Sequence, residues 1–207
     1  MAIQINGTGT ITGITAGGYP DGTVTADDLA DTLDLSGKTV TLPSGTGGKV
    51  LQVVQSVKTS EQSNSSDSYV QIADLNCSIT PSATSSKILI MVQISSNIYS
   101  GYNSSFFRLT KNGTAISGAL GDDSGDNNEE VSFADTANTS NNKAMNTVGT
   151  TYLDSPSSTS SLTYGVQWAV ENTNSTYQNY INGPYARDDS SYRARAISTI
   201  TLMEVAG

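Results

Sequence analysis

The chain of 207 residues carries 10 basic and 19 acidic side chains, a net charge of −9, and no histidine. An acidic chain repels a phosphate backbone, so nucleic acid is not expected as a partner. Without histidine the commonest general base, the serine–histidine triad and the usual zinc ligand set are missing, so we expect no enzyme, no cofactor and no metal site.

The first 48 residues predict three small elements. Residues 1–18 alternate with a period of two, with isoleucine and glycine on one side and polar residues on the other, which predicts one thin strand. Residues 25–33 place apolar side chains at helical spacing behind a capping-box pattern, which predicts a short helix. A second brief strand leads into the hinge-like PSGTGG at 43–48. Because about a dozen apolar side chains cannot close a core alone, we expect an extended segment that other chains stabilise.

This N-terminal segment is predicted to dock and to trimerise. A strand with glycine and isoleucine on one side is stable only when another chain supplies its hydrogen bonds or covers its apolar face. We expect strand addition, either onto symmetry mates or onto another protein, and a threefold cluster of leucines from the helix. The residues predicted to dock are Ile3, Ile5, Ile11, Ile14, Leu29 and Leu33.

From Lys49 onward the sequence predicts long strands, in a chain of which serine and threonine supply about a quarter. The second of these strands switches its apolar parity between Ile72 and Leu75, which indicates a bulge. The pair Asn112-Gly113 stands between strand-like flanks and predicts a hairpin turn. The predicted strands lie at residues 49–57, 69–79, 87–98, 106–116, 145–153, 162–170 and 192–205.

These patterns predict an all-β chain in two parts. Strands linked by turns, with no helical patterns between them, favour an antiparallel sandwich of jelly-roll type, which we expect as a knob over residues 49–207. Residues 1–48 are expected as a small extended anchoring and trimerisation segment with one short helix. Within the knob, Trp168 and Cys77 share strand faces with aliphatic residues, so both are predicted to lie in the core.

No segment is expected to carry the chain across or into a membrane. The N-terminal MAIQING has no basic stretch followed by an apolar one, so no secretory signal is expected. The longest apolar run, ILIMV at 88–92, is too short to cross a bilayer. We therefore expect a protein made in the cytoplasm, without export or membrane insertion.

The acidic loop GDDSGDNNEE at 121–130 is the one stretch that concentrates carboxylates. Its spacing does not match the calcium loop with a glutamate at the twelfth position, so a solvated loop is favoured over a cation site. The glycine-rich GTGTITG and GTGG lack the lysine–serine pair and the following helix of a phosphate-binding loop.

Tyrosines gather in the segments NIYSGYNS and TYQNYINGPYARDD. Exposed rings with polar neighbours, at an end of a sandwich where loops meet, are compatible with a receptor or glycan patch. Packing between identical subunits, where tyrosine is enriched, is the favoured interpretation, and single surface tyrosines need no explanation. The residues predicted as receptor contacts are Tyr99, Tyr102, Tyr177, Tyr180 and Tyr185.

Four segments resemble virion structural proteins of tailed bacteriophages, especially those of marine cyanobacteria, which are often labelled tail fibre-like or head decoration proteins. The segments are MAIQINGTGTITGITAGG, DGTVTADDL, LSGKTVTLPSGTGGKVLQVV and RARAISTITLMEV. The resemblance covers both ends and the linker and implies a trimeric, β-rich appendage. It implies that the N-terminal segment attaches to the particle while the C-terminal domain faces outward.

The leading expectation is therefore a phage virion component: a homotrimeric tail fibre or capsid decoration protein, bound to other capsid, collar or tail proteins through residues 1–48. The alternative is a receptor-binding module for host attachment, which recognises host cell-surface polysaccharide through the tyrosine-rich loops. A third hypothesis is a polysaccharide-degrading enzyme that uses two carboxylates, such as Asp122 with Glu130.

Overall fold

The computed structural model describes most of the chain from Lys49 onward. The described ranges are 49–98, 103–122, 130–136, 145–171, 173, 178–184 and 194–207. The elements and docking residues predicted within 1–48 lie outside the described residues. The expectation of an anchoring segment there stays a prediction.

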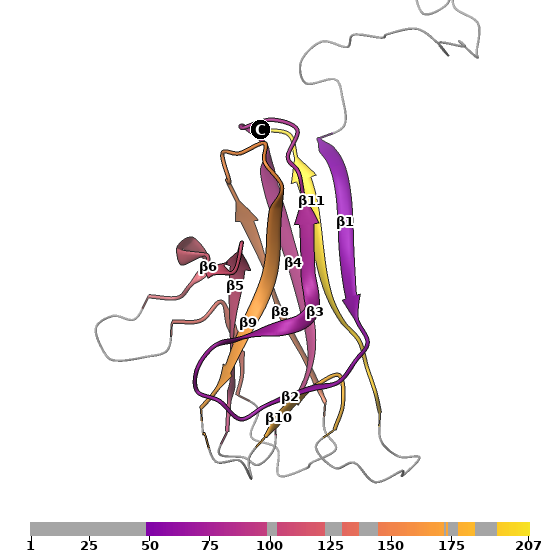
Figure 1. Cartoon of the computed structure of the whole chain (residues 1–207), viewed down its shortest axis with the longest axis vertical. Coiled ribbons are helices and arrows are strands. Elements are labelled where there is room, and N and C mark those ends of the chain that lie inside the picture. The colour runs from indigo at the N-terminus through magenta and orange to yellow at the C-terminus, as the bar shows by residue number, and fades with distance from the viewer. Residues whose placement is uncertain are drawn as a thin grey trace, which may run out of the picture. The chain divides into compact units, whose positions relative to one another are not determined.

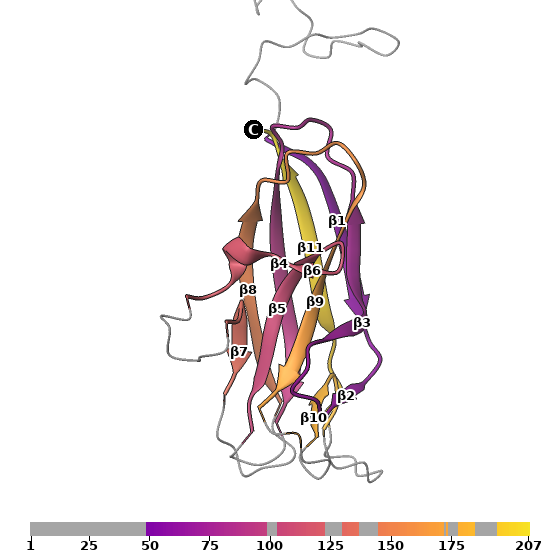
Figure 2. The same cartoon turned by 60° about the vertical axis from the view of Figure 1, so that its left-hand side comes forward.

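Two antiparallel sheets pack face to face as a β-sandwich (Figures 1 and 2). The six-stranded sheet consists of β1 (Val50–Lys58), β11 (Ser198–Val205), β4 (Lys87–Asn97), β8 (Asn146–Asp154), β10 (Asn179–Ile181) and β2 (Gln62–Asn64). The five-stranded sheet consists of β3 (Val70–Ile79), β9 (Leu162–Val170), β5 (Ser105–Lys111), β6 (Thr114–Ala115) and β7 (Phe133–Asp135). A 3-10 helix, Ser117–Ala119, follows β6.

The strands pair as a nested series. Strand β1 pairs with β11, β3 with β9, β4 with β8, and β5 with β6 and β7, all antiparallel. The pairs β11–β4 and β9–β5 then join these units into the two sheets. The long strands β1, β3, β4 and β5 therefore alternate between the sheets, and β8, β9 and β11 do so again. Each sheet is assembled from strands that are distant in sequence.

The hydrophobic core lies between the sheets and uses alternate residues of each strand. Trp168 and Cys77 are both buried in it, which confirms the predictions for these residues. Phe107 stacks on Trp168 with ring centroids 6.2 Å apart, and Phe133 stacks on Phe107 at 4.8 Å. The predicted core faces of β4 and β9 are buried at every position, namely Ile88, Ile90, Val92, Ile94, Ile98, Leu162, Tyr164, Val166, Trp168 and Val170.

Two local predictions are confirmed. The register between β3 and β9 shifts between Gln71 and Asn76, at the predicted bulge, and Asp74 adopts a φ of 59° there. Between β5 and β6, Asn112 and Gly113 have φ values of 51° and 80°, the left-handed backbone that a two-residue type I′ turn requires.

The last predicted strand is shorter than expected. The prediction began at residue 192, whereas β11 begins at Ser198 and residues 194–197 form no strand. Three strands of three residues each, β2, β7 and β10, were not predicted because a period of two cannot be recognised over so few positions. Strand β10 pairs with β4 at Ser96 and Asn97, beyond the stretch that β11 occupies.

Candidate interaction surface

The outer face of the six-stranded sheet carries a continuous row of aliphatic side chains. The row crosses four neighbouring strands: Val53 of β1 is paired with Met203 of β11, Met203 with Leu89 of β4, and Leu89 with Leu153 of β8. Directly paired side chains on one face lie about 5 Å apart, so each of the four is in contact distance of its neighbour in the row. Val53 is 52% exposed and Leu153 45% exposed.

Further apolar side chains extend this row along the strands. A register shift between Val50 and Gln52 leaves both Val50 and Leu51 about half exposed at the start of β1. We call the whole set the apolar face. It consists of Val50, Leu51, Val53, Val57, Leu89, Met91, Leu153, Met203 and Val205.

The apolar face is almost free of charge. Of the outward-facing positions on β1, β11, β4 and β8, Lys87 is the only one that carries a charged side chain. The chain as a whole has a net charge of −9. Contiguous apolar patches of several hundred Å² on a folded protein mark interaction sites more often than chance exposure does. This surface therefore has the composition of an interface.

The sequence contained a signal for this face that the predictions did not use. The segments VLQVV of β1 and KILIMV of β4 are apolar at both parities, not at alternate positions. A strand that is apolar on both sides is typically covered on both sides. The core accounts for one side of β4, through Ile88 and Ile90, and leaves Leu89 and Met91 facing outward.

The outer face of the five-stranded sheet is different in character. Its outward residues are mostly polar, and Arg108 lies over the ring of Tyr69 at 3.8 Å from the ring centroid. A cavity of about 210 Å³ lies beside the β3 bulge and is lined by Gln71, Asn76, Thr110, Gly113, Thr163 and Gly165. The outer face of the five-stranded sheet is therefore more polar than that of the six-stranded sheet.

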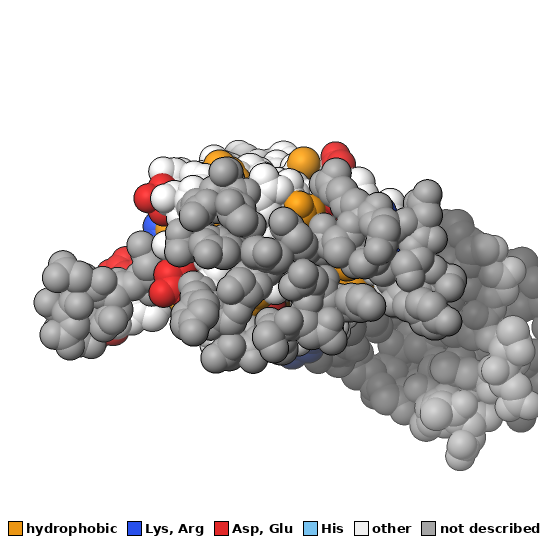
Figure 3. Space-filling view, turned by 90° about the horizontal axis from the view of Figure 1, so that it is seen from below, with side chains coloured by type: hydrophobic (Ala, Val, Ile, Leu, Met, Phe, Trp, Pro, Cys, Tyr) orange, Lys and Arg blue, Asp and Glu red, His pale blue; other side chains and the backbone are white. Residues whose placement is uncertain are grey.

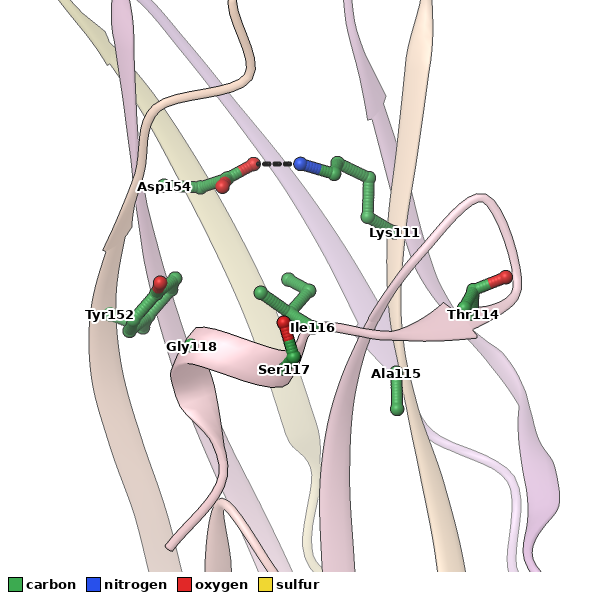
Figure 4. Close-up of a pocket in the computed structure, with 8 residues that line it drawn as sticks. All are labelled: Lys111, Thr114, Ala115, Ile116, Ser117, Gly118, Tyr152 and Asp154. Atoms are coloured by element: carbon green, nitrogen blue, oxygen red, sulfur yellow. Dashed lines mark hydrogen bonds and ion pairs between the residues drawn. The ribbon is translucent and has the colours of Figure 1, made fainter. Parts of the chain in front are cut away.

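A second cavity, of about 300 Å³, opens between the β5–β6 hairpin and β8 (Figure 4). Lys111 Nζ lies 2.9 Å from Asp154 Oδ2, and the buried Tyr164 hydroxyl donates to the same oxygen at 2.6 Å. Burial, followed by the hydrogen bond to Asp154, raises the pKa of the Tyr164 hydroxyl. The charged groups at this cavity are paired with one another, and they connect the two sheets.

The end of the sandwich that holds β2 and β10 has a polar interior. Asn182 donates to the Lys58 carbonyl oxygen at 2.8 Å and accepts from the Ser198 hydroxyl at 2.6 Å, and Asn179 donates to Ser105 Oγ at 2.8 Å. Figure 3 views this end, and a few separate hydrophobic side chains are visible among the described residues there. At this end, hydrogen bonds from buried amides and hydroxyls hold the backbone in place. Between the long strands, the contacts are mainly those of aliphatic side chains.

Lys58 is buried at the same end. Its ammonium donates to Ser60 Oγ at 2.9 Å, and burial lowers its pKa, an effect that the negative charge of Asp74 partly offsets. The group makes a structural hydrogen bond at the end of β1.

The prediction of Tyr180 as a receptor contact needs correction. Tyr180 belongs to β10 and is only 4% exposed, with its hydroxyl donating to Gln178 Oε1 at 2.8 Å. The sequence pattern does not reveal this three-residue strand. Ile181, the next residue of β10, belongs to the core, so Tyr180 lies on the opposite side of the strand and is buried there. The other four predicted contacts, Tyr99, Tyr102, Tyr177 and Tyr185, lie outside the described residues.

The acidic loop is described only at its ends. Asp122 and Glu130 are within the described residues, and the backbone oxygen of Glu130 accepts from Arg108 Nε at 2.7 Å. In the described ranges no three acidic or cysteine side chains come together as a metal site. The described residues also include no helix with the length and hydrophobicity of a membrane span.

Comparison of the sequence with protein-family models and with curated proteins finds no match to either.

Proposed function

We propose that the chain is a structural component of a tailed-phage virion, a trimeric fibre or decoration protein. In this proposal residues 49–207 form a jelly-roll-type knob, and residues 1–48 trimerise the knob and attach it to capsid, collar or tail proteins. The function needs shape and association, and it needs no chemistry.

The observation that carries the proposal is the closure of the described core. Its fully buried hydrophobic residues lie between Ile72 and Leu202, and Val54 packs against them from β1. Burying each such side chain contributes roughly 1.5–3 kcal/mol to the stability of the fold. This supports a domain that folds without residues 1–48. The N-terminal segment is then available for assembly.

The strand order supports the jelly-roll assignment. Nested antiparallel pairs, with successive long strands in opposite sheets, are what results when one long hairpin wraps into two sheets. The short strands β6 and β7 together occupy the position of the remaining strand beside β5.

The position of Lys49 supports the division of roles. Its carbonyl oxygen accepts from the Ala206 backbone N–H at 2.7 Å, so the start of β1 and the end of β11 lie together at one end of the sandwich. Strands β2 and β10 lie at the opposite end (Figure 1). A segment that anchors the knob through Lys49 would leave that opposite end facing away from the particle.

Two deletions test the proposal. Starting the chain at Lys49 should leave a knob that unfolds cooperatively at the wild-type midpoint, while the full chain has the native mass of a trimer. Deleting residues 1–20 should abolish incorporation into particles without lowering that midpoint. Wild-type incorporation of either shortened chain would refute the anchoring role, and a knob that does not fold would refute the domain division.

A further inference from the structure

We infer that the apolar face of the six-stranded sheet is covered by a second copy of this chain. This inference rests on the proposed function for the existence of an oligomer, and it goes further by naming the surface through which neighbouring knobs contact one another.

The outer face of the four long strands has the size of an interface between proteins. Four strands about 4.8 Å apart, each with four outward residues about 6.7 Å apart, make a face of roughly 500 Å², and about half of these positions belong to the apolar face. Side chains corrugate this plane, so contact over the whole outer face buries an area that approaches the roughly 800 Å² per partner of a stable complex. Val53 and Leu153, each about half exposed, mark the two edges of the row.

The charge distribution favours a second copy as the partner. Two chains that each carry a net charge of −9 repel one another unless they meet through uncharged surfaces. The apolar face offers such a surface, because Lys87 is its only charged neighbour on the outward side of the four long strands. The aliphatic row also crosses the sheet from β1 at one edge to β8 at the other. When the outer faces of two copies pack against each other, the two rows therefore cross and apolar side chains contact apolar side chains.

The N-terminal segment and the apolar face are adjacent in the sequence. Residues 1–48 join the sandwich at Lys49, directly before Val50 and Leu51 of the apolar face. If these segments hold three chains together, short tethers keep the knobs at an effective concentration in the millimolar range. Even a modest apolar contact is then populated.

The experiment uses the full chain and two double variants with equal charge change. Val53→Lys with Leu153→Lys places two ammonium groups on the apolar face, at positions exposed enough to tolerate them in the folded knob. The matched control is Asn76→Lys with Ser78→Lys, at exposed positions on the outer face of the other sheet. We expect the association constant to fall at least tenfold in the first variant and to stay at the wild-type value in the control, as measured by native mass over a dilution series.

A second experiment labels introduced cysteines with a maleimide and adds no charge to the apolar face. Val53→Cys should react with a maleimide at least tenfold more slowly than Ala73→Cys, which lies exposed in the β3 bulge; the wild-type chain gives the background from the buried Cys77.

Each other outcome overturns the inference. Equal labelling rates would mean that nothing covers the face, and slow labelling in a chain of monomeric mass would mean that its own residues 1–48 cover it. Wild-type association of the first variant, with its melting temperature unchanged, would place the contact elsewhere. Incorporation of the chain into particles is measured separately. If the apolar face is covered but the chain is not incorporated, the virion function is refuted and this inference stands. If the chain is incorporated but the apolar face is uncovered, this inference is refuted and the virion function stands.

Discussion

Lys111 of β5 and Asp154 of β8 form an ion pair between the two sheets, with Nζ 2.9 Å from Oδ2 (Figure 4). The same carboxylate oxygen accepts a hydrogen bond from Tyr164 of β9, whose ring is fully buried. One carboxylate therefore ties together three strands from both sheets. Lys111 and Asp154 both line the cavity of about 300 Å³ between the β5–β6 hairpin and β8.

Replacing this carboxylate is expected to be costly. Asp154→Ala leaves the Tyr164 hydroxyl buried without its acceptor and removes the partner of Lys111, so we expect a loss of about 2–4 kcal/mol in the free energy of unfolding. Urea unfolding at pH 7 measures it. Tyr164→Phe removes only the hydroxyl and should cost about 1 kcal/mol. An unfolding midpoint of Asp154→Ala equal to that of the wild type would show that the bridge does not hold the sheets.

Glu204 gives the stability of the knob a defined dependence on pH. Its side chain is 1% exposed on the inner side of β11. Burial alone raises the pKa of this carboxyl, but hydrogen bonds from Ser82 and Gln52 outweigh burial and bring the pKa from 4.5 to about 2. The ionised form therefore stabilises the fold fully above about pH 4.5, and this contribution is lost as the pH falls toward 2.

The variant Glu204→Gln tests this dependence. At pH 7 it should lower the free energy of unfolding by about 2–3 kcal/mol, because the charge-assisted hydrogen bonds become neutral ones. The difference from the wild type should shrink as the pH is lowered from 4.5 to 2, since the wild-type carboxyl becomes protonated as well. Thermal unfolding across that range measures both chains. A difference that stays constant with pH would refute the lowered pKa.

The turn between β5 and β6 allows the energetic cost of left-handed backbone to be measured separately from steric clashes. A Cβ added at Gly113 would meet no atom within 4 Å, so the only cost of Gly113→Ala is its φ of 80°. We expect a loss of about 1–2 kcal/mol. Gly121→Ala is the matched control, because the nearest atom to its added Cβ is the Val131 oxygen at 3.8 Å and its φ is not left-handed. Equal stability of the two variants in urea would argue against the type I′ turn.

The features that could be predicted from sequence are those set by neighbouring residues. The alternation of β4 from Ile88 to Ile94, the bulge after Ile72 and the Asn112-Gly113 turn all follow from local chemistry. Pairings such as β1 with β11 join residues about 150 positions apart, and no local signal specifies them.

The candidate surface was missed for a related reason. The prediction treated each strand as having one apolar side, whereas Leu89 and Met91 lie on the opposite side from Ile88 and Ile90. That these residues align with Val53 and Leu153 depends on the register of four strands, which only the assembled sheet defines. Tyr180 shows the converse: its polar neighbours in sequence predict exposure, whereas it is only 4% exposed in the folded chain.

Asn182 combines backbone strain with a buried hydrogen-bond network, and two variants separate these effects. Its φ of 63° lies in the left-handed region, and its side-chain amide bonds to Lys58 and Ser60 carbonyl oxygens while its side-chain oxygen accepts from Ser198. Asn182→Gly keeps the backbone freedom and loses the three side-chain hydrogen bonds, so we expect a loss of about 2–4 kcal/mol. Asn182→Ala loses the same bonds and adds the strain of a Cβ in that region, about 1 kcal/mol more. Because both variants remove the same bonds, the difference between their unfolding free energies reports the strain, reduced by the greater unfolded-state entropy of the glycine variant. Alanine and glycine variants of equal stability would show that the backbone at residue 182 relaxes once its side chain is gone.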